Sequence, residues 1–149
     1  MKAVVQRVTS AKVSIDGREH SSIRGGLLIF LGLKIGDTSE DAKYLAEKCC
    51  SLRVFEDEHQ KMNLSVKDVG GAILAVSQFT LYGDTRRGNR PSFTEAAPPE
   101  IAEPLYNDFV DALRNHLSDD KVATGIFRAM MDVELTNDGP VTLIVESKG

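Results

Sequence analysis

The chain has 149 residues, of which 42% are hydrophobic and 27% are charged, and its net charge at pH 7 is −4. This length matches one domain, and the composition is that of a folded protein rather than of a disordered or fibrous one. The negative net charge argues against a protein that coats nucleic acid by bulk electrostatics, so any contact with RNA has to be local.

The chain begins with β structure. Ala3–Val8 and Lys12–Ile15 are patterned as short strands, and Asp16-Gly17 supplies residues that tolerate the positive φ angles of a tight hairpin turn. Gly25-Gly26 then introduces Leu27–Leu31. This continuous apolar run predicts a strand that is covered on both faces.

A first helix follows the capping-box pattern of Thr38–Asp41 and extends to about Leu52. Its apolar residues recur at helical spacing, namely Ala42, Leu45, Ala46, Cys49 and Cys50. The two cysteines are the only ones in the chain, and no CxxC or Cys/His cluster accompanies them. We therefore expect both to be reduced core residues.

The middle of the chain returns to strand patterning. Arg53–Phe55 reads as a strand, and the acidic stretch Glu56–Gln60 reads as a solvated turn. After Gly70-Gly71, the apolar residues of Ala72–Leu81 predict a second buried strand.

A second helix is predicted after the loop that Pro98-Pro99 closes, with Pro104 tolerated in its first turn. Its apolar stripe consists of Ile101, Leu105, Phe109, Leu113 and Leu117. Three further strands are predicted at Val122–Phe127, Met131–Leu135 and Val141–Val145, with Asn137–Pro140 as a sharp interruption. Together these elements predict an α/β fold in a single domain over residues 1–149. Its mixed β-sheets would form a sandwich or barrel-like structure, with two amphipathic helices packed on one side.

No segment predicts export or membrane insertion. The N-terminal residues MKAVVQRV turn polar too early for a signal peptide, and the longest apolar run, Leu27–Leu33, is far too short to span a bilayer. We expect a cytosolic protein that makes no contact with a membrane.

Common catalytic motifs are missing from the sequence. It contains no HExxH, no GxSxG, no Walker loop and no GxGxxG after a strand, and His20, His59 and His116 are scattered as surface or helix-end residues would be. We therefore expect an activity that needs neither a metal ion nor a cofactor. Any chemistry has to rest on hydroxyls, amides and backbone groups, which two polar segments supply, Ser77–Leu81 and Asn137–Thr142.

Each polar segment also has a purely structural interpretation. Ser77 and Thr80 could satisfy nearby backbone groups, Gln78 could face solvent, and Gly139-Pro140 could be a turn. The same holds for the loop at 83–91. Its arginines Arg86, Arg87 and Arg90 could hold a tRNA backbone or simply be solvated.

Several long motifs, taken together, resemble the D-aminoacyl-tRNA deacylase family. They are AVVQRV at the start, DVGGAILAVSQFTLYGDTRRGNRPSF in the middle, AAPPE before the second helix and NDGPVT near the end. The resemblance covers essentially the whole chain. It implies an aminoacyl-tRNA ester hydrolase that works as a homodimer with its active site at the interface.

The resemblance also implies roles for individual residues. The segment Ser77, Gln78, Phe79, Thr80 forms the floor of the catalytic pocket. The pair Gly139-Pro140 is a cis-proline gate that the partner subunit inserts, with Arg7 packed against it and Asn137, Val141 and Thr142 beside it. Phe127 and Met131 border the pocket for the terminal adenosine of tRNA. Arg128 and Met130 stand where the family usually has a small residue and an acidic one.

A chiral filter follows from this implied gate. The paired carbonyls of Gly139 and Pro140 would hold the α-ammonium group, so that an L-side chain would collide with the gate and a D-side chain would point outward. Glycine has no side chain to collide, so the implied substrates are D-aminoacyl-tRNA and Gly-tRNA, including glycine mischarged on tRNA-Ala. Backbone N–H groups near Phe79 and Thr80, with the Gln78 amide, would stabilise the oxyanion while the tRNA 2′-hydroxyl helps to activate water. A second interpretation makes Thr80 the nucleophile, although no activating base lies beside it in the sequence.

Other functional classes stay open at this point. A related editing deacylase would remove L-alanine from misacylated tRNA through a trans Gly-Pro gate. A non-catalytic module of the type described for DNA-unwinding-element-binding proteins would contact DNA, against which the acidic net charge counts. A pure interaction protein would leave both polar segments without a role.

Overall fold

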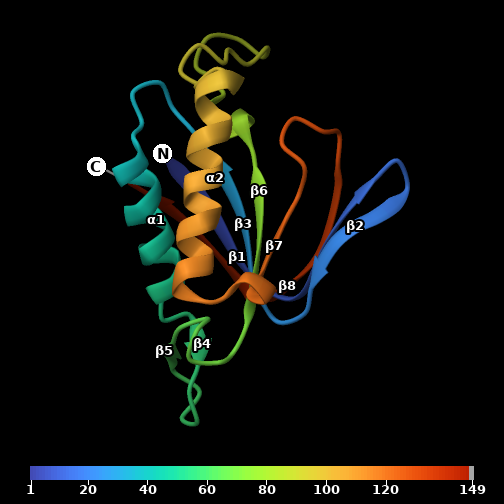
Figure 1. Cartoon of the computed structure of the whole chain (residues 1–149), viewed down its shortest axis with the longest axis vertical. Coiled ribbons are helices and arrows are strands. Elements are labelled where there is room, and N and C mark those ends of the chain that lie inside the picture. The colour runs from blue at the N-terminus through green and yellow to red at the C-terminus, as the bar shows by residue number, and fades with distance from the viewer. Residues whose placement is uncertain (148–149) are drawn as a thin grey trace.

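The computed structural model describes residues 1–147 and is organised around one long strand, β1 (Lys2–Ile15). Along one edge, β1 pairs first with β3 (Gly26–Gly32) and then with β2 (Arg18–Ile23). Its other edge pairs with β8 (Asp132–Glu146), and all three pairings are antiparallel (Figure 1).

The division of β1 into two strands was wrong. Thr9 and Ser10 are exposed, yet they lie within the strand, between the residues that pair with β3 and those that pair with β2. The polar pair therefore marks a change of partner, which local patterning does not distinguish from a strand end.

On the far side of β3 the sheet continues with two parallel strands, β6 (Ala72–Ser77) and β7 (Val122–Thr124). Every residue of β3 is buried except the half-buried Phe30, which confirms the predicted two-sided cover. A separate two-stranded hairpin consists of β4 (Phe55–Glu56) and β5 (Met62–Leu64).

Two helices, α1 (Ser39–Ser51) and α2 (Pro99–His116), cover one face of the sheet, as predicted (Figure 1). Thr38 caps α1 in a complete capping box with Asp41. Ile101 was expected on the buried stripe of α2 but is 49% exposed, because Ala102 and Tyr106 face the core instead.

The opposite face of the sheet has its own apolar cluster. The second half of β1, together with β2 and the first half of β8, curls over β3 and β6 and makes the sheet barrel-like. The buried members of this cluster are Val8, Ala11, Val13, Ile23, Leu28, Leu74 and Val76.

Several predicted element ends were wrong. The strand predicted to reach Leu81 ends at Ser77 and is followed by a short 3-10 helix, η1 (Phe79–Tyr82), and the one predicted to reach Phe127 ends at Thr124. Arg53 lies outside any strand, and α2 begins at Pro99, so Pro104 lies within the helix rather than in its first turn. A second 3-10 helix, η2 (Asp119–Lys121), precedes β7.

The segment 137–140 does not interrupt β8. Gln6 pairs with Thr142 and Val8 pairs with Asn137, so four residues of β8, 138–141, lie opposite the single residue Arg7. Four residues opposite one form an enlarged bulge, which keeps the strand continuous while it pushes Gly139 and Pro140 outward.

The cysteines and histidines lie as predicted. Cys49 and Cys50 are unpaired and buried, and burial raises the pKa of the Cys49 thiol to about 12, which keeps it protonated and unreactive. His20 and His59 are exposed, and His116 ends α2. Neither of the helices within residues 1–147 is long and apolar enough to cross a membrane.

Candidate active site

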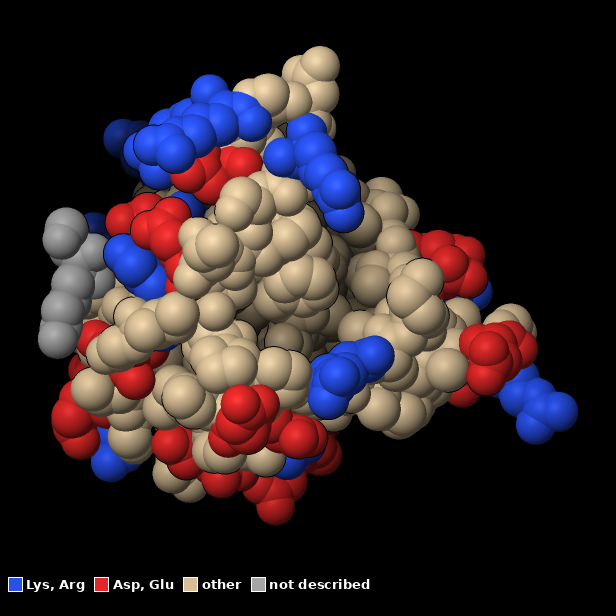
Figure 2. Space-filling view, turned by 90° about the horizontal axis from the view of Figure 1, so that it is seen from above, with Lys and Arg blue, Asp and Glu red and all other residues tan. Residues whose placement is uncertain are grey.

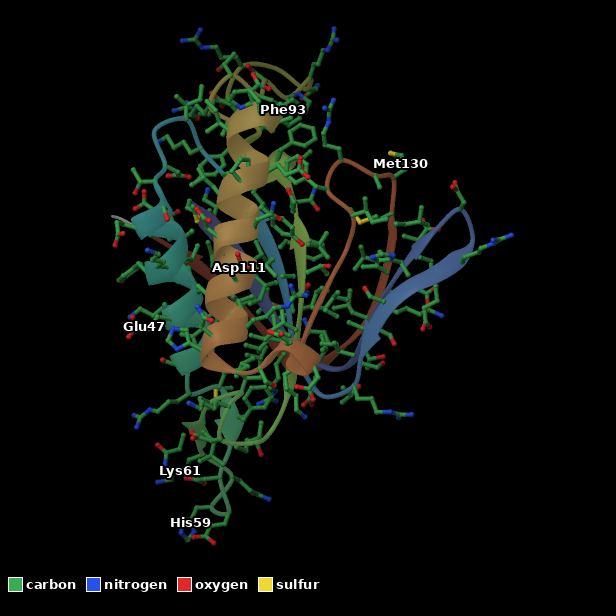
Figure 3. All side chains as sticks on the ribbon, in the orientation of Figure 1. Glu47, His59, Lys61, Phe93, Asp111 and Met130 are labelled. Carbon is green, nitrogen blue, oxygen red and sulfur yellow. The ribbon has the colours of Figure 1, made fainter. Side chains whose placement is uncertain are left out.

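A cleft of about 630 Å³ opens at the end of β6, between the N-terminus of α2 and the segment 127–131. It is hollowed into the face that Figure 2 shows from above, where lysine or arginine side chains reach its rim. Phe93 and Met130 face each other across its mouth (Figure 3). Most of its lining is apolar or aromatic, which suits a flat, uncharged ring system.

The floor of the cleft is built where β6 stops. Ser77 is paired with Leu31 of β3, and the next amide, that of Gln78, donates to the Leu31 carbonyl at 2.8 Å. The chain then turns into η1, which packs directly on β3, because a Cβ on Gly32 would lie 2.9 Å from the Cβ of Leu81. A side chain at position 32 would push η1 away from the sheet.

This turn leaves two backbone donors without an internal partner. The amides of Phe79 and Thr80 are the first of η1, so they precede any carbonyl to which the turn could bond them. No acceptor for either amide lies within residues 1–147. Two adjacent N–H groups at the floor of an apolar cleft are an arrangement that can bind an oxyanion.

The side chains of the floor differ in what they face. Ser77, Gln78 and Phe79 line the cleft, whereas Thr80 is exposed beside it and its hydroxyl accepts a hydrogen bond from the Gln78 side-chain amide. No histidine, lysine or carboxylate lines the cleft, in the part of the chain that the structure describes, so nothing there activates Thr80 as a nucleophile.

Aromatic contacts shape the walls. Phe79 packs edge-on against Phe93 at a centroid distance of 5.1 Å, and Phe127 lies 6.0 Å from Tyr106. The Tyr106 hydroxyl is buried and donates to the carbonyl of Ala75 in β6 at 2.7 Å, which ties α2 to the strand that carries the floor. Burial raises the pKa of this hydroxyl well above its usual value.

The wall at 127–131 depends on close packing of Met131. A Cβ on Gly125 would lie 2.6 Å from the Met131 sulfur, so only glycine lets Met131 lie where it does. Phe127 and Met131, the residues implied for the adenosine pocket, therefore both line the cleft, together with Arg128 and Met130.

The gate segment, residues 137–142 of β8, does not line the cleft and is held by hydrogen bonds of buried or half-buried side chains. The Arg7 side chain is 7% exposed, and its Nη1 donates to the Val54 carbonyl at 2.7 Å. Its Nε donates to the Asp138 carbonyl at 3.2 Å and lies 3.3 Å from the Asp138 carboxylate. The Arg7 Nη2 also lies 3.0 Å from where a Cβ on Gly139 would be, so Arg7 packs tightly under the gate.

Asn137 holds the other end of the gate segment. Its side-chain oxygen accepts from the Val141 amide at 3.0 Å, and its side-chain nitrogen donates to the Thr142 hydroxyl at 2.9 Å. Between these contacts the Gly139–Pro140 peptide bond is cis and both residues are exposed. The residues implied for the gate are thus brought together, with Gly139 and Pro140 presented outward.

One chain does not bring its gate to its own cleft. Ser77 is level with Leu31 and Ala3, whereas the gate lies opposite Arg7, four residues farther along β1, which is about 13 Å along the strands. Strands β3 and β1 also separate β6 from β8. The two polar segments that the sequence singled out therefore form two separate surfaces of one molecule.

The arginine loop lies near the cleft, since Phe93 lines the cleft and Ser92 pairs with Asp84 at the base of the loop. Arg86 is engaged there in a bidentate pair with the Asp84 carboxylate, at 2.9 and 2.8 Å, which lowers the pKa of Asp84 to about 2. Arg87 and Arg90 are exposed and have no partner among residues 1–147.

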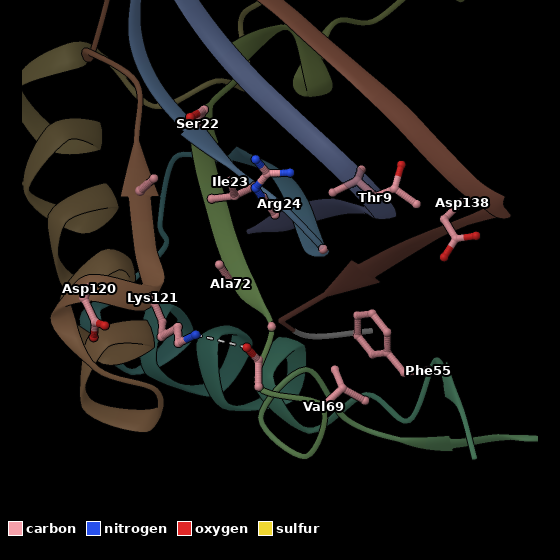
Figure 4. A pocket seen from close by; sticks show the side chains of 15 residues that line it. Thr9, Ser22, Ile23, Arg24, Phe55, Val69, Ala72, Asp120, Lys121 and Asp138 are labelled. Atoms are coloured by element: carbon pink, nitrogen blue, oxygen red, sulfur yellow. Dashed lines mark hydrogen bonds between the residues drawn. The ribbon is translucent and has the colours of Figure 1, made fainter. Parts of the chain in front are cut away.

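A second cavity of about 690 Å³ lies at the other end of the parallel strands, beside the gate. Figure 4 shows Arg24, Lys121 and Asp138 around it. The Lys121 ammonium group donates to the Gly70 carbonyl at 3.1 Å. No group of three or more His, Cys, Asp or Glu side chains is placed to hold a metal ion, here or elsewhere in residues 1–147.

Sequence reasoning missed one wall of the cleft. Phe93, Ala97 and Pro98 line it from the loop before α2, and Tyr106 anchors it from within that helix. The motif AAPPE carried a signal for this wall, but the pairing of Phe93 with Phe79 joins positions 14 residues apart, so nothing local predicted it.

A family model and two relatives match the chain over nearly its whole length. The family model described as D-Tyr-tRNA(Tyr) deacylase matches residues 4–146. A D-aminoacyl-tRNA deacylase of Halalkalibacterium halodurans is 59% identical over 99% of this chain and 100% of its own length. One of Thermosipho africanus is 55% identical over 99% of this chain and 98% of its own.

Two solved structures are similar to the fold. The c-Myc DNA unwinding element binding protein is 44% identical, with a TM-score of 0.95 over the full length of both chains. A probable eukaryotic D-amino acid tRNA deacylase has a TM-score of 0.82 over 97% of this chain and 98% of its own. At 14% identity, this second likeness concerns the fold alone.

Proposed function

The chain belongs to the D-Tyr-tRNA(Tyr) deacylase family, and from this premise we propose that it hydrolyses the ester bond between a D-amino acid and the terminal adenosine of tRNA. The observation that carries the proposal is the floor of the apolar cleft. There, two unpaired backbone amides, those of Phe79 and Thr80, lie beside Gln78 in the SQFTL motif.

In this proposal the adenosine of the substrate lies in the cleft. Phe127 and Met131 contact the base, and the ester carbonyl is directed to the floor. The tetrahedral intermediate is an oxyanion, and the amides of Phe79 and Thr80 donate to it together with the Gln78 side chain. Removing one such donor from comparable sites costs about 2.7–4 kcal/mol of transition-state stabilisation.

Water is activated by the substrate in this mechanism. The cleft lining, as far as the structure describes it, contains no side chain that could act as a general base near neutral pH. The 2′-hydroxyl of the terminal ribose lies next to the ester in any aminoacyl-tRNA and takes this role. Thr80 then supports Gln78 through their hydrogen bond rather than acting as a nucleophile.

The active unit is a homodimer in this proposal. Gly139 and Pro140 project from the bulge of β8, away from the cleft of their own chain, so a second copy is needed to bring a gate to each cleft. The gate of the partner then holds the α-ammonium group of the substrate by backbone carbonyls and blocks the side where an L-side chain would lie.

This gate selects D-aminoacyl esters by excluding L-aminoacyl esters, since backbone atoms make no favourable contact with a particular D-side chain. The filter therefore admits many D-residues and also glycine, which includes Gly-tRNA and glycine mischarged on tRNA-Ala. Arg87 and Arg90, the free cations of the loop beside the cleft, contact the tRNA backbone.

A second candidate function rests on the likeness to the c-Myc DNA unwinding element binding protein. Binding of duplex DNA requires a basic surface, whereas this chain has a net charge of −4. An editing deacylase for L-Ala-tRNA differs from our proposal only in substrate. Hydrolysis assays distinguish both alternatives from our proposal, since the editing enzyme would hydrolyse L-Ala-tRNA and a non-catalytic module would hydrolyse no aminoacyl-tRNA.

The test measures single-turnover hydrolysis of D-Tyr-tRNA, L-Tyr-tRNA, L-Ala-tRNA and Gly-tRNA by the purified protein. We expect turnover of D-Tyr-tRNA and Gly-tRNA and none of the two L-esters. Inactivity toward D-Tyr-tRNA would overturn the proposed function. Exclusion of glycine as strict as that of L-alanine would replace steric rejection by a pocket that grips the D-side chain.

A further inference from the structure

Arg128 is the only charged side chain that lines the cleft within the part of the chain that the structure describes. It belongs to the same wall segment as Phe127 and Met131, whereas Gln78 and Phe79 belong to the floor. The described lining of the cleft thus combines a polar floor and apolar side chains with a single positive charge.

The backbone at Arg128 has a conformation that suits glycine better than arginine. Its φ angle is +69°, and the Ala129 amide donates to the Ile126 carbonyl at 3.1 Å, which closes a tight turn with Arg128 at its third position. A positive φ at this position is typical of glycine or asparagine. An arginine here is disfavoured by its backbone and gains nothing from the turn itself.

The guanidinium group is also without an internal role. Arg7, Arg86 and Arg114 donate to carbonyls or a carboxylate of this chain. No hydrogen bond or ion pair of Arg128 is found among residues 1–147, and its side chain is exposed. Five N–H donors in a fixed planar fork are thus free at the edge of the cleft, which is the geometry that matches a phosphate.

The substrate carries a negative charge close to its ester. In an aminoacyl-tRNA, the phosphodiester nearest to the ester is the one on the 5′ side of the terminal ribose, so only that ribose separates the phosphate from the ester. We propose that Arg128 binds this phosphate and so positions the terminal adenosine, an inference that rests on the function proposed above. Arg128 is a positioning residue that takes no part in bond cleavage.

Binding of a small, non-hydrolysable probe tests this directly. The probe is 3′-deoxy-3′-(D-tyrosylamino)adenosine, with and without a 5′-phosphate. The wild-type protein should bind the phosphorylated form roughly three- to tenfold more tightly, since a partly exposed charge pair is screened by solvent. In Arg128→Gly the ratio should fall to about one, and in Arg128→Lys part of it should return.

Folding does not confound this variant, because glycine relieves the positive φ of the turn and should leave the melting temperature unchanged or raised. Arg18→Gly is the matched control. It removes an exposed arginine at the start of β2, which lines neither the cleft nor the cavity beside the gate, and should keep the wild-type ratio. A ratio that is near one in the wild type, or that is unchanged in Arg128→Gly, overturns the assignment.

Kinetics with D-Tyr-tRNA separate this inference from the proposed function. Arg128→Gly should raise KM and leave kcat unchanged, and it should reduce the slope of log KM against log salt by about one. A wild-type protein that hydrolyses D-Tyr-tRNA with the same KM and salt slope as the variant contradicts only the role of Arg128. A wild-type protein that does not hydrolyse it contradicts the proposed function, whatever the binding ratio of the probe.

Discussion

The cleft and the gate segment are built in opposite ways. The cleft is open and mostly apolar, its floor leaves two amides unpaired, and Met130 at its mouth is 90% exposed. In the gate segment, Arg7 donates to backbone carbonyls below Gly139-Pro140, and Asn137 bonds both the Val141 amide and the Thr142 side chain.

This difference fits two different tasks in one reaction. A surface that accepts a large ligand needs room and free donors, whereas a surface that rejects a ligand by collision has to stay in place when it is pressed. In the proposed mechanism, a gate that moved outward would admit the L-side chain. The anchored surface and the open one lie apart in a single chain, so the proposal requires that they meet between two copies.

The largest expected effect comes from altering the cleft in one chain and the gate in another. Gln78→Ala alters only the cleft and Pro140→Ala only the gate, and each homodimer should lose activity toward D-Tyr-tRNA, by about a hundredfold or more for Gln78→Ala. Mixed dimers contain one site with both surfaces intact. An equal mixture should therefore recover roughly a quarter of the wild-type activity if subunits exchange freely.

Co-expression with two different affinity tags isolates the mixed dimer. Its control is a mixed dimer of wild-type chains carrying the same tags. If the doubly tagged dimer is only as active as the two single-variant homodimers, each chain uses its own gate. The proposal of a site shared between two chains would then be wrong.

A smaller effect is expected from loosening the gate. Arg7→Met leaves the Val54 and Asp138 carbonyls without their donor, so the free energy of unfolding should fall by about 2 kcal/mol. Rejection should weaken at the same time, with measurable hydrolysis of L-Tyr-tRNA. Urea unfolding and single-turnover assays measure the two effects.

Lys12→Met is the matched control for this variant, since it removes an exposed ion pair with Glu134 from the same two strands. Its free energy of unfolding should change by less than about 0.5 kcal/mol, because exposed pairs contribute little. A variant of Arg7 as stable and as selective as the wild type would mean that the gate does not depend on this anchor.

The same contrast explains what the sequence could predict. Periodicity correctly identified both helices, the two buried strands β3 and β6, and the packing of the helices on one side of the sheet, because these depend on local patterns. It failed at Thr9-Ser10 and at 137–140, where a strand changes partner or bulges against Arg7. The bulge depends on the pairing of residues more than a hundred positions apart, and the change of partner depends on how β2 and β3 divide one edge of β1. Local patterning contains neither.

The candidate site was likewise predicted only in part. Ser77 and Gln78 were singled out as polar positions at the end of a buried strand, whereas Phe79 and Phe127 were implied by the resemblance, and all four line the cleft. The exact turn that frees two amides was not predicted, since the strand was expected to continue to Leu81. The shared use of the gate stays a prediction that rests on resemblance and on the separation of the two surfaces.

A modest effect is expected within the floor itself. Thr80→Ala removes a hydroxyl that accepts from Gln78 but lies outside the cleft, so the variant should keep the rate of D-Tyr-tRNA hydrolysis within about tenfold of the wild type. A nucleophile would behave differently, with nearly complete loss in a folded protein. That result would favour Thr80 as the nucleophile over water activated by the 2′-hydroxyl. Replacing the terminal adenosine by its 2′-deoxy form tests the other half, and should slow hydrolysis by both proteins.

The smallest expected effect is that of chelation, which should leave the rate unchanged. The cleft lining within residues 1–147 offers no carboxylate, imidazole or thiolate, and the proposed contribution of the gate is its backbone carbonyls, so neither surface supplies the ligand set of a tightly bound divalent ion. Because tRNA itself folds with Mg²⁺, loss of activity toward tRNA in the presence of a chelator would not by itself implicate the protein. The measurement therefore uses D-tyrosyl-adenosine, which has no tertiary structure to lose. If EDTA abolished its hydrolysis and added Zn²⁺ or Mg²⁺ restored it, water would have to be activated by a metal rather than by the 2′-hydroxyl, and the open cleft would be an incomplete metal site rather than an oxyanion site.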